Sequence, residues 1–86
     1  MQLGEFINII DTGSQYIPIK VISELTEPEA PAKGTVLFEG SMSELAYDNP
    51  VIFGEEPDEV FLDELYVDTI DVGADIDTDG FTIYVC

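Results

Sequence analysis

The chain has a net charge of −17 over 86 residues, because nineteen acidic side chains face only two lysines. Charge of one sign makes a compact state repel itself and lowers its stability. The single cysteine excludes an internal disulfide, and without histidine the chain has no His/Cys cluster for zinc. An apolar core must therefore supply the stability of any fold that this chain adopts.

The composition provides such a core, since 45% of the residues are hydrophobic. Ten isoleucines and seven valines favour a fold that contains a β-sheet over disorder. The length predicts one domain, residues 1–86. No apolar run approaches the roughly 20 residues of a membrane span, and the N-terminus lacks the pattern of a signal peptide. We therefore expect a cytoplasmic protein that does not enter a membrane.

The first apolar residues, Leu3, Phe6, Ile7 and Ile10, repeat at the i, i+3, i+4, i+7 spacing of one helical face. The spacing predicts a helix that residues 11–14 stop, with Gly13 at the C′ position. A strand over residues 6–10 is the alternative.

Alternating apolar residues predict a strand over 16–23, in which Ile17, Ile19 and Val21 share one face. Pro18 cannot donate a hydrogen bond to a neighbouring strand, so we expect this strand at a sheet edge. Residues 24–34, with two prolines, predict an exposed loop.

A second strand is predicted over 35–39, ended by Gly40. Ser41 and Glu44 then have the spacing of a capping box, which predicts a short helix that ends before Pro50. Met42, Leu45 and Ala46 are the apolar residues of this helix. A small apolar patch at 51–53 and an acidic turn at 54–59 follow. Pro57 favours a helical turn over 58–64, with a strand as the alternative.

The end of the chain predicts a β-hairpin. Apolar residues at 70, 72, 74 and 76 alternate with Asp71, Gly73, Asp75 and Asp77, and a second alternation covers 81–85. Asp79-Gly80 is typical of a two-residue type I′ turn. The fold class predicted is therefore α+β: a single small domain in the order α-β-β-α-β-β, with two short helices on one face of a four-stranded, mainly antiparallel sheet.

A partial calcium motif overlaps this hairpin. Asp75, Asp77, Asp79 and Gly80 match positions 1, 3, 5 and 6 of an EF-hand loop. Position 12, which should supply a bidentate glutamate, is the terminal Cys86. The hairpin already explains the motif, so we expect no metal and no other cofactor, and keep calcium binding as an alternative.

From Glu44 to Cys86 the chain has thirteen acids and no basic residue. Carboxylates at i and i+2 of a strand lie roughly 6.6 Å apart on one face, comparable to successive phosphates of a nucleic acid. We therefore predict an anionic surface that occupies a cleft lined by Lys and Arg. Solubility and adaptation to high salt are the competing interpretations of these acids. The predicted partner-binding residues are Glu55, Glu56, Asp58, Glu59, Asp63, Glu64, Asp68, Asp71, Asp75 and Asp77.

Catalysis is not expected. The chain has no His, Arg or Trp to activate a nucleophile or orient a substrate. Ser41 is explained as a helix cap, and Cys86 has no cation near it in the sequence to activate its thiol.

Size, charge and element order together resemble the small acidic inhibitors that phages encode against host defence, which include anti-CRISPR proteins and DNA mimics that block DNA-binding enzymes. The segment 38–45 (FEGSMSEL) and the hairpin at 75–85 are similar to small proteins of phages and prophages in Firmicutes. The resemblance implies a partner in the host's nucleic-acid machinery, and it implies no site residues.

The function predicted is thus non-enzymatic inhibition of a basic nucleic-acid-binding protein, such as a CRISPR–Cas effector, in the host cytoplasm. Direct binding to nucleic acid is not expected, because both molecules are anionic. One alternative is a calcium-binding structural module. Another is an interaction protein that oligomerises through the sheet edge inferred from Pro18, so that a monomer and a small homo-oligomer both remain open.

Overall fold

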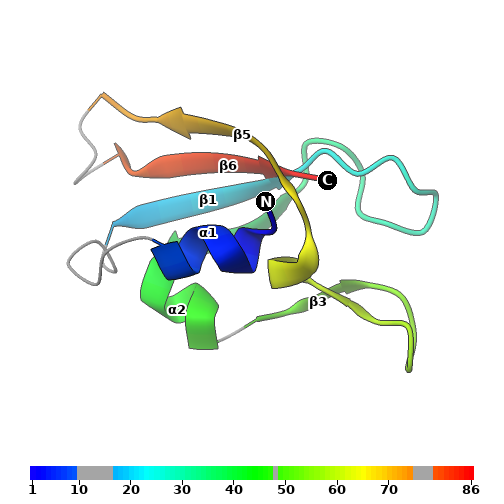
Figure 1. Ribbon diagram of the computed structural model, residues 1–86. Coiled ribbons are helices and arrows are strands. Elements are labelled where there is room, and N and C mark those ends of the chain that lie inside the picture. The colour runs from blue at the N-terminus through cyan, green and yellow to red at the C-terminus, as the bar shows by residue number, and fades with distance from the viewer. Residues whose placement is uncertain (10–16, 48, 75–78) are drawn as a thin grey trace.

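The computed structural model describes residues 1–9, 17–47, 49–74 and 79–86, which form an α+β domain (Figure 1). Its elements, in chain order, are α1 (Leu3–Ile9), β1 (Pro18–Ser23), β2 (Val36–Ser41), α2 (Met42–Tyr47), β3 (Val51–Phe53), β4 (Val60–Phe61), the short 3-10 helix η2 (Leu62–Glu64), β5 (Val67–Val72) and β6 (Phe81–Val85).

The main sheet has four strands in the order β2-β1-β6-β5. The β1–β2 and β5–β6 pairs are antiparallel, whereas β1 and β6 run parallel. The predicted α+β class, four-stranded sheet and two short helices are confirmed. The sheet is mixed rather than mainly antiparallel, because the last strand inserts beside β1 instead of extending the sheet by consecutive hairpins.

The strand that contains Pro18 lies inside this sheet, so its prediction as an edge strand is wrong. Pro18 is the first residue of β1, opposite Ser41 of β2. Proline is tolerated at a strand's first residue. The two edges are β2 and β5 instead.

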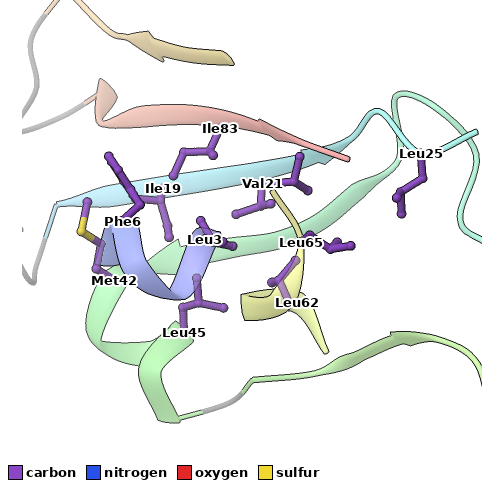
Figure 2. Close-up of a cluster of buried hydrophobic side chains, with 11 residues drawn as sticks. Leu3, Phe6, Ile19, Val21, Leu25, Met42, Leu45, Leu62, Leu65 and Ile83 are labelled. Carbon is purple, nitrogen blue, oxygen red and sulfur yellow. The ribbon is translucent and has the colours of Figure 1, made fainter. Parts of the chain in front are cut away.

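The core lies between one face of the sheet and the elements that cover it, α1, α2 and η2 (Figure 2). Helix α1 is confirmed over Leu3–Ile9, and its predicted continuation and stop lie outside the described residues. The Phe6 ring of α1 meets the Phe81 ring of β6 edge-on, with centroids 6.2 Å apart. The buried hydrophobic residues are Leu3, Phe6, Ile19, Val21, Leu25, Met42, Leu45, Leu62, Leu65, Ile83 and Val85.

Strand β2 continues through Gly40, which the sequence predicted to end it. Gly40 pairs with Ile19, and a Cβ on it would lie 2.5 Å from Glu44 Oε2 and 3.2 Å from the Phe38 ring. Glycine within a strand often marks such a close approach. The helix cap is confirmed, since the Glu44 N–H donates to Ser41 Oγ over 3.2 Å.

The region between α2 and β5 forms a second, two-stranded antiparallel sheet of β3 and β4. The patch at 51–53 is thus a strand. Both alternatives for 58–64 are partly right, because β4 is followed directly by η2. The Leu62 N–H donates to the Pro50 carbonyl over 2.9 Å, and the Leu62 side chain is buried, which fixes this small sheet to the core.

The C-terminal hairpin of β5 and β6 is confirmed, but its predicted turn is wrong. β5 ends at Val72, and the Gly73 N–H donates to the Gly80 carbonyl over 2.9 Å. A type I′ turn needs positive φ at both central residues. Gly80 has φ +63°, whereas Asp79 has helical backbone, so the connection is longer than two residues.

Residues 24–34 form the predicted loop between β1 and β2. Leu25 within it is nonetheless buried in the core. Two backbone bonds close the base of the loop: Ser23 donates to the Thr35 carbonyl, and Gly34 donates to the Ser23 carbonyl, each over 2.8 Å.

Candidate functional site

The acids predicted to bind a partner lie on three different elements. Glu55, Glu56, Asp58 and Glu59 occupy the turn between β3 and β4, and we call them the acidic turn. Asp63 and Glu64 belong to η2, and Asp68 and Asp71 to β5. Asp75 and Asp77 lie outside the described residues. The eight described acids thus come from three elements, and their union in one broad surface stays a prediction.

The acidic turn is tight and depends on Gly54. Gly54 has φ +94°, and a Cβ at this position would lie 2.5 Å from the Asp58 carbonyl oxygen. The Asp58 N–H donates to the Glu55 carbonyl over 2.6 Å. The side chains of Glu55, Glu56 and Asp58 are exposed, and Glu59 is half-buried. The backbone thus holds three solvated carboxylates within four consecutive residues.

An open hollow lies beside this turn, lined by Glu29, Phe53, Gly54, Glu55, Glu56 and Asp58. Glu29 comes from the loop between β1 and β2, so two segments far apart in the sequence contribute carboxylates to one place. Phe53 adds an aromatic side chain. Carboxylates and an aromatic ring together attract ammonium and guanidinium groups, so the hollow suits a lysine or arginine side chain.

Backbone contacts hold the two acidic residues of η2 in place. The Asp63 N–H donates to Asn49 Oδ1 over 3.0 Å, and the Asp63 Cβ would lie 3.2 Å from a Cβ on Gly4. The Glu64 carbonyl accepts a bond from Gln2 Nε2 over 3.3 Å. Asp63 is half-buried, so Glu64 is the more accessible of the two carboxylates.

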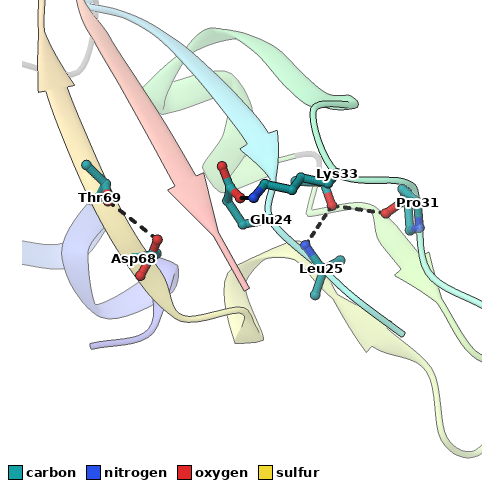
Figure 3. Close-up of polar contacts among 7 residues, drawn as sticks. Glu24, Leu25, Pro31, Lys33, Asp68 and Thr69 are labelled. Carbon is teal, nitrogen blue, oxygen red and sulfur yellow. Dashed lines mark hydrogen bonds and ion pairs between the residues drawn. The ribbon is translucent and has the colours of Figure 1, made fainter. Parts of the chain in front are cut away.

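Asp68 and Asp71 are exposed on β5, the edge strand of the main sheet. The Thr69 hydroxyl donates to Asp68 Oδ2 over 3.4 Å (Figure 3). The predicted common face of Asp71, Asp75 and Asp77 involves two residues outside the described ranges, so it stays a prediction. β5 ends at Val72, and Gly73 and Ala74 lie outside any strand.

The two lysines are placed differently. Lys33 Nζ lies 3.3 Å from Glu24 Oε2 at the base of the loop between β1 and β2 (Figure 3). Lys20 lies on β1, where its strand neighbours are Glu39 of β2 and Thr82 of β6. Neither lysine lines the hollow beside the acidic turn.

Metal binding gains no support from the described residues. Among them, no three His, Cys, Asp or Glu side chains are placed to hold a metal ion. The calcium motif consists of Asp75, Asp77 and Asp79, and the first two lie outside the described residues. The calcium alternative therefore stays a prediction.

No protein-family model matches the chain, and comparison with curated proteins and with solved structures gives no match either. Within the described ranges, none of the helices has the length and apolar character that crossing a bilayer requires. The function must therefore be argued from the surface itself.

One surface feature was missed by the sequence reasoning. Ile70 and Val72 of β5, which belong to the apolar side of the predicted hairpin, are 36% and 59% exposed. The alternation of apolar and acidic residues predicts on which face of the sheet Ile70 and Val72 lie. It does not reveal that β5 is an edge strand of that sheet. Their exposure could have been expected only if the strand order had been known.

Proposed function

We propose that this protein is a non-enzymatic inhibitor that binds the basic, nucleic-acid-binding cleft of a host protein through its carboxylates. The phage-type resemblance makes a CRISPR–Cas effector the first target to test. The observation that carries the proposal is the acidic turn with its hollow, where Glu29 joins Glu55, Glu56 and Asp58.

The electrostatics support this proposal. A cleft that holds DNA or RNA is lined by Lys and Arg, and a protein with a net charge of −17 is drawn to it at long range. The acidic turn places exposed carboxylates on a short ribbon that Leu62 and Pro50 tie to the core. Such a preorganised charge group loses little conformational freedom when it binds.

The test uses a purified CRISPR–Cas effector loaded with guide RNA and a fluorescent target duplex. We expect the wild-type protein to displace the duplex at about 0.1 M NaCl and to lose most of this effect at about 0.5 M. The triple variant E55Q/E56Q/D58N should inhibit less well, by on the order of tenfold, because several charges of one group act together. Single substitutions in the turn should each have a modest effect.

The matched control is E5Q/E27Q/E39Q, which removes the same number of charges from exposed positions outside the predicted set. It should keep wild-type inhibition within about twofold. Equal weakening by both triple variants would assign the effect to overall charge rather than to the turn. Binding that is insensitive to salt, or that leaves the duplex bound, would contradict nucleic-acid mimicry.

A further inference from the structure

The outward side of β5 carries backbone groups that form no hydrogen bond with another described residue. The Gly73 N–H donates to the Gly80 carbonyl, which sets the hydrogen-bond pattern between the two strands. Counting back in steps of two, the backbone groups of Gly73, Asp71 and Thr69 point toward β6. Antiparallel strands alternate between residues that bond to the neighbour and residues that point away. The N–H and C=O groups of Ile70 and Val72 therefore point away from β6, toward the sheet edge.

Residues at the N-terminus pair with the beginning of this edge. The Val67 N–H donates to the Met1 carbonyl, and the Leu3 N–H donates to the Leu65 carbonyl, each over 2.8 Å. Gln2 thereby bridges antiparallel to Tyr66. Beyond Val67, no backbone hydrogen bond among the described residues reaches the outward groups of Ile70 or Val72. With respect to the described parts of the chain, the edge is thus paired at its start and open along its second half.

The open half is also apolar on one side. Ile70 pairs with the buried Ile83, and Val72 pairs with Phe81, which packs against Phe6. Ile70 and Val72 therefore lie on the core side of the sheet, yet they stay 36% and 59% exposed. A strand added at this edge would cover both side chains and extend the core.

Charge decides which occupant this edge suits. Asp68 and Asp71 are exposed on the same strand. Lys20 lies on the same face of the sheet as Asp71, but β6 with Thr82 separates the two, so the edge strand itself stays negatively charged. If two copies paired antiparallel over Ile70–Val72, the two Asp71 carboxylates would lie directly opposite each other. Like charges in that position destabilise a strand pair, and net charges of −17 would add to the repulsion.

We propose that the open half of the β5 edge binds an extended segment of a partner protein in which basic residues alternate with apolar residues. The segment adds a strand to the sheet, its apolar side chains cover Ile70 and Val72, and its basic side chains meet Asp71 and Asp68. This inference goes beyond the proposed function, because it concerns a different surface from the acidic turn and a backbone-directed mode of binding.

The probe is a capped synthetic peptide of alternating lysine and valine, titrated into the ¹⁵N-labelled protein and followed by NMR. We expect the largest shifts at the amides of Ile70 and Val72, and slower hydrogen exchange of these two amides in the presence of the peptide. A peptide of alternating glutamate and valine should cause no shifts. Shifts centred on the acidic turn, with Ile70 and Val72 unmoved, would overturn the proposal.

Two variants separate the backbone contribution from the charge contribution. V72P removes one outward N–H at a position where an edge strand tolerates proline, and it should weaken the peptide about tenfold. D71K should weaken it to a similar degree, whereas D58K, with the same net charge, should change affinity less than about twofold. An unchanged affinity in D71K, or an equal loss in D58K, would contradict the proposal even if V72P failed to fold.

Light scattering of the free protein tests the competing occupant. We expect a monomer at all concentrations, because β5 repels its own copy. A dimer that D71K strengthens or V72P abolishes would assign the edge to a second copy and overturn the proposal for a basic partner. Negative results in these experiments would not affect the duplex-displacement test of the acidic turn. The proposed strand addition at β5 and the proposed inhibition through the acidic turn can therefore be rejected independently.

Discussion

Gly34 and Gly80 have similar backbone conformations in very different surroundings. Their φ angles are +91° and +63°, in the region that L side chains rarely adopt. A Cβ on Gly34 would meet nothing within 4 Å, whereas a Cβ on Gly80 would overlap the carbonyl oxygen of Pro18. Gly80 thus lets the end of the β5–β6 connection pass against the first residue of β1.

This contrast predicts the effect of an alanine at each site. Gly34→Ala should lower the free energy of unfolding by about 1 kcal/mol, the cost of the left-handed conformation alone. Gly80→Ala should cost at least about 3 kcal/mol, because the clash is with backbone that cannot rotate away. Urea unfolding followed by circular dichroism measures both values. Equal losses would mean that the β5–β6 connection does not approach Pro18 as described.

At the scale of elements, one buried hydroxyl adds side-chain hydrogen bonds to the backbone bonds that close the loop between β1 and β2. Ser23 is fully buried; its Oγ donates to the Pro31 carbonyl over 3.1 Å and accepts from the Leu25 N–H over 3.1 Å. Leu25 itself packs into the core. The hydroxyl therefore fixes a long loop from both of its ends, and the same loop presents Glu29 to the hollow beside the acidic turn.

Ser23→Ala should lower the free energy of unfolding by about 1–3 kcal/mol, since the buried Leu25 N–H would lose its acceptor. Thr26→Ala, in the exposed part of the same loop, should cost less than about 0.5 kcal/mol. The comparison is made by urea denaturation, with hydrogen exchange at Leu25 as a local readout. A Ser23→Ala protein as stable as Thr26→Ala would show that the loop does not depend on this hydroxyl.

Elements with a clear local period were predictable from the sequence, but the way in which they pack beside one another was not. Helical spacing gave α1, alternation gave β1 and β6, and the Ser41 cap gave α2. The predicted position of β1 at a sheet edge was wrong, because strand order depends on contacts between distant parts of the chain. The β3–β4 sheet was missed because its strands are too short to show a period.

The candidate site follows the same division. The exposure of Glu55, Glu56 and Asp58 could be predicted, because charged residues around glycine and proline favour a solvated turn. The contribution of Glu29 to their hollow could not, since it depends on how the loop between β1 and β2 packs. The open edge at Ile70 and Val72 likewise required the strand order.

At the scale of the whole molecule, the core lies on one side of the main sheet and the acids are spread around it. The covered face holds Ile19, Val21 and Ile83, all buried. On the opposite face lie Lys20 and its strand neighbours Glu39 and Thr82, which remain partly or fully accessible. The net charge of −17 opposes compaction of this fold.

This repulsion predicts that salt stabilises the protein. Raising NaCl from about 0.05 M to about 0.5 M shortens the screening length and should raise the Tm by roughly 5 °C or more. Thermal unfolding followed by circular dichroism measures the shift. In E55Q/E56Q/D58N the Tm at low salt should be higher than in wild type and the gain from salt smaller, because part of the repulsion is already gone.

A comparison of divalent cations separates screening from specific binding. Calcium and magnesium chloride at equal concentration should raise the Tm by the same amount if the ions only screen the carboxylates. A larger effect of calcium would instead support a site at Asp75, Asp77 and Asp79, because calcium accepts flexible carboxylate coordination more readily than magnesium does. A Tm that does not change with NaCl, calcium chloride or magnesium chloride would contradict repulsion among the carboxylates. It would then also contradict the premise that the net charge lowers the stability of the fold.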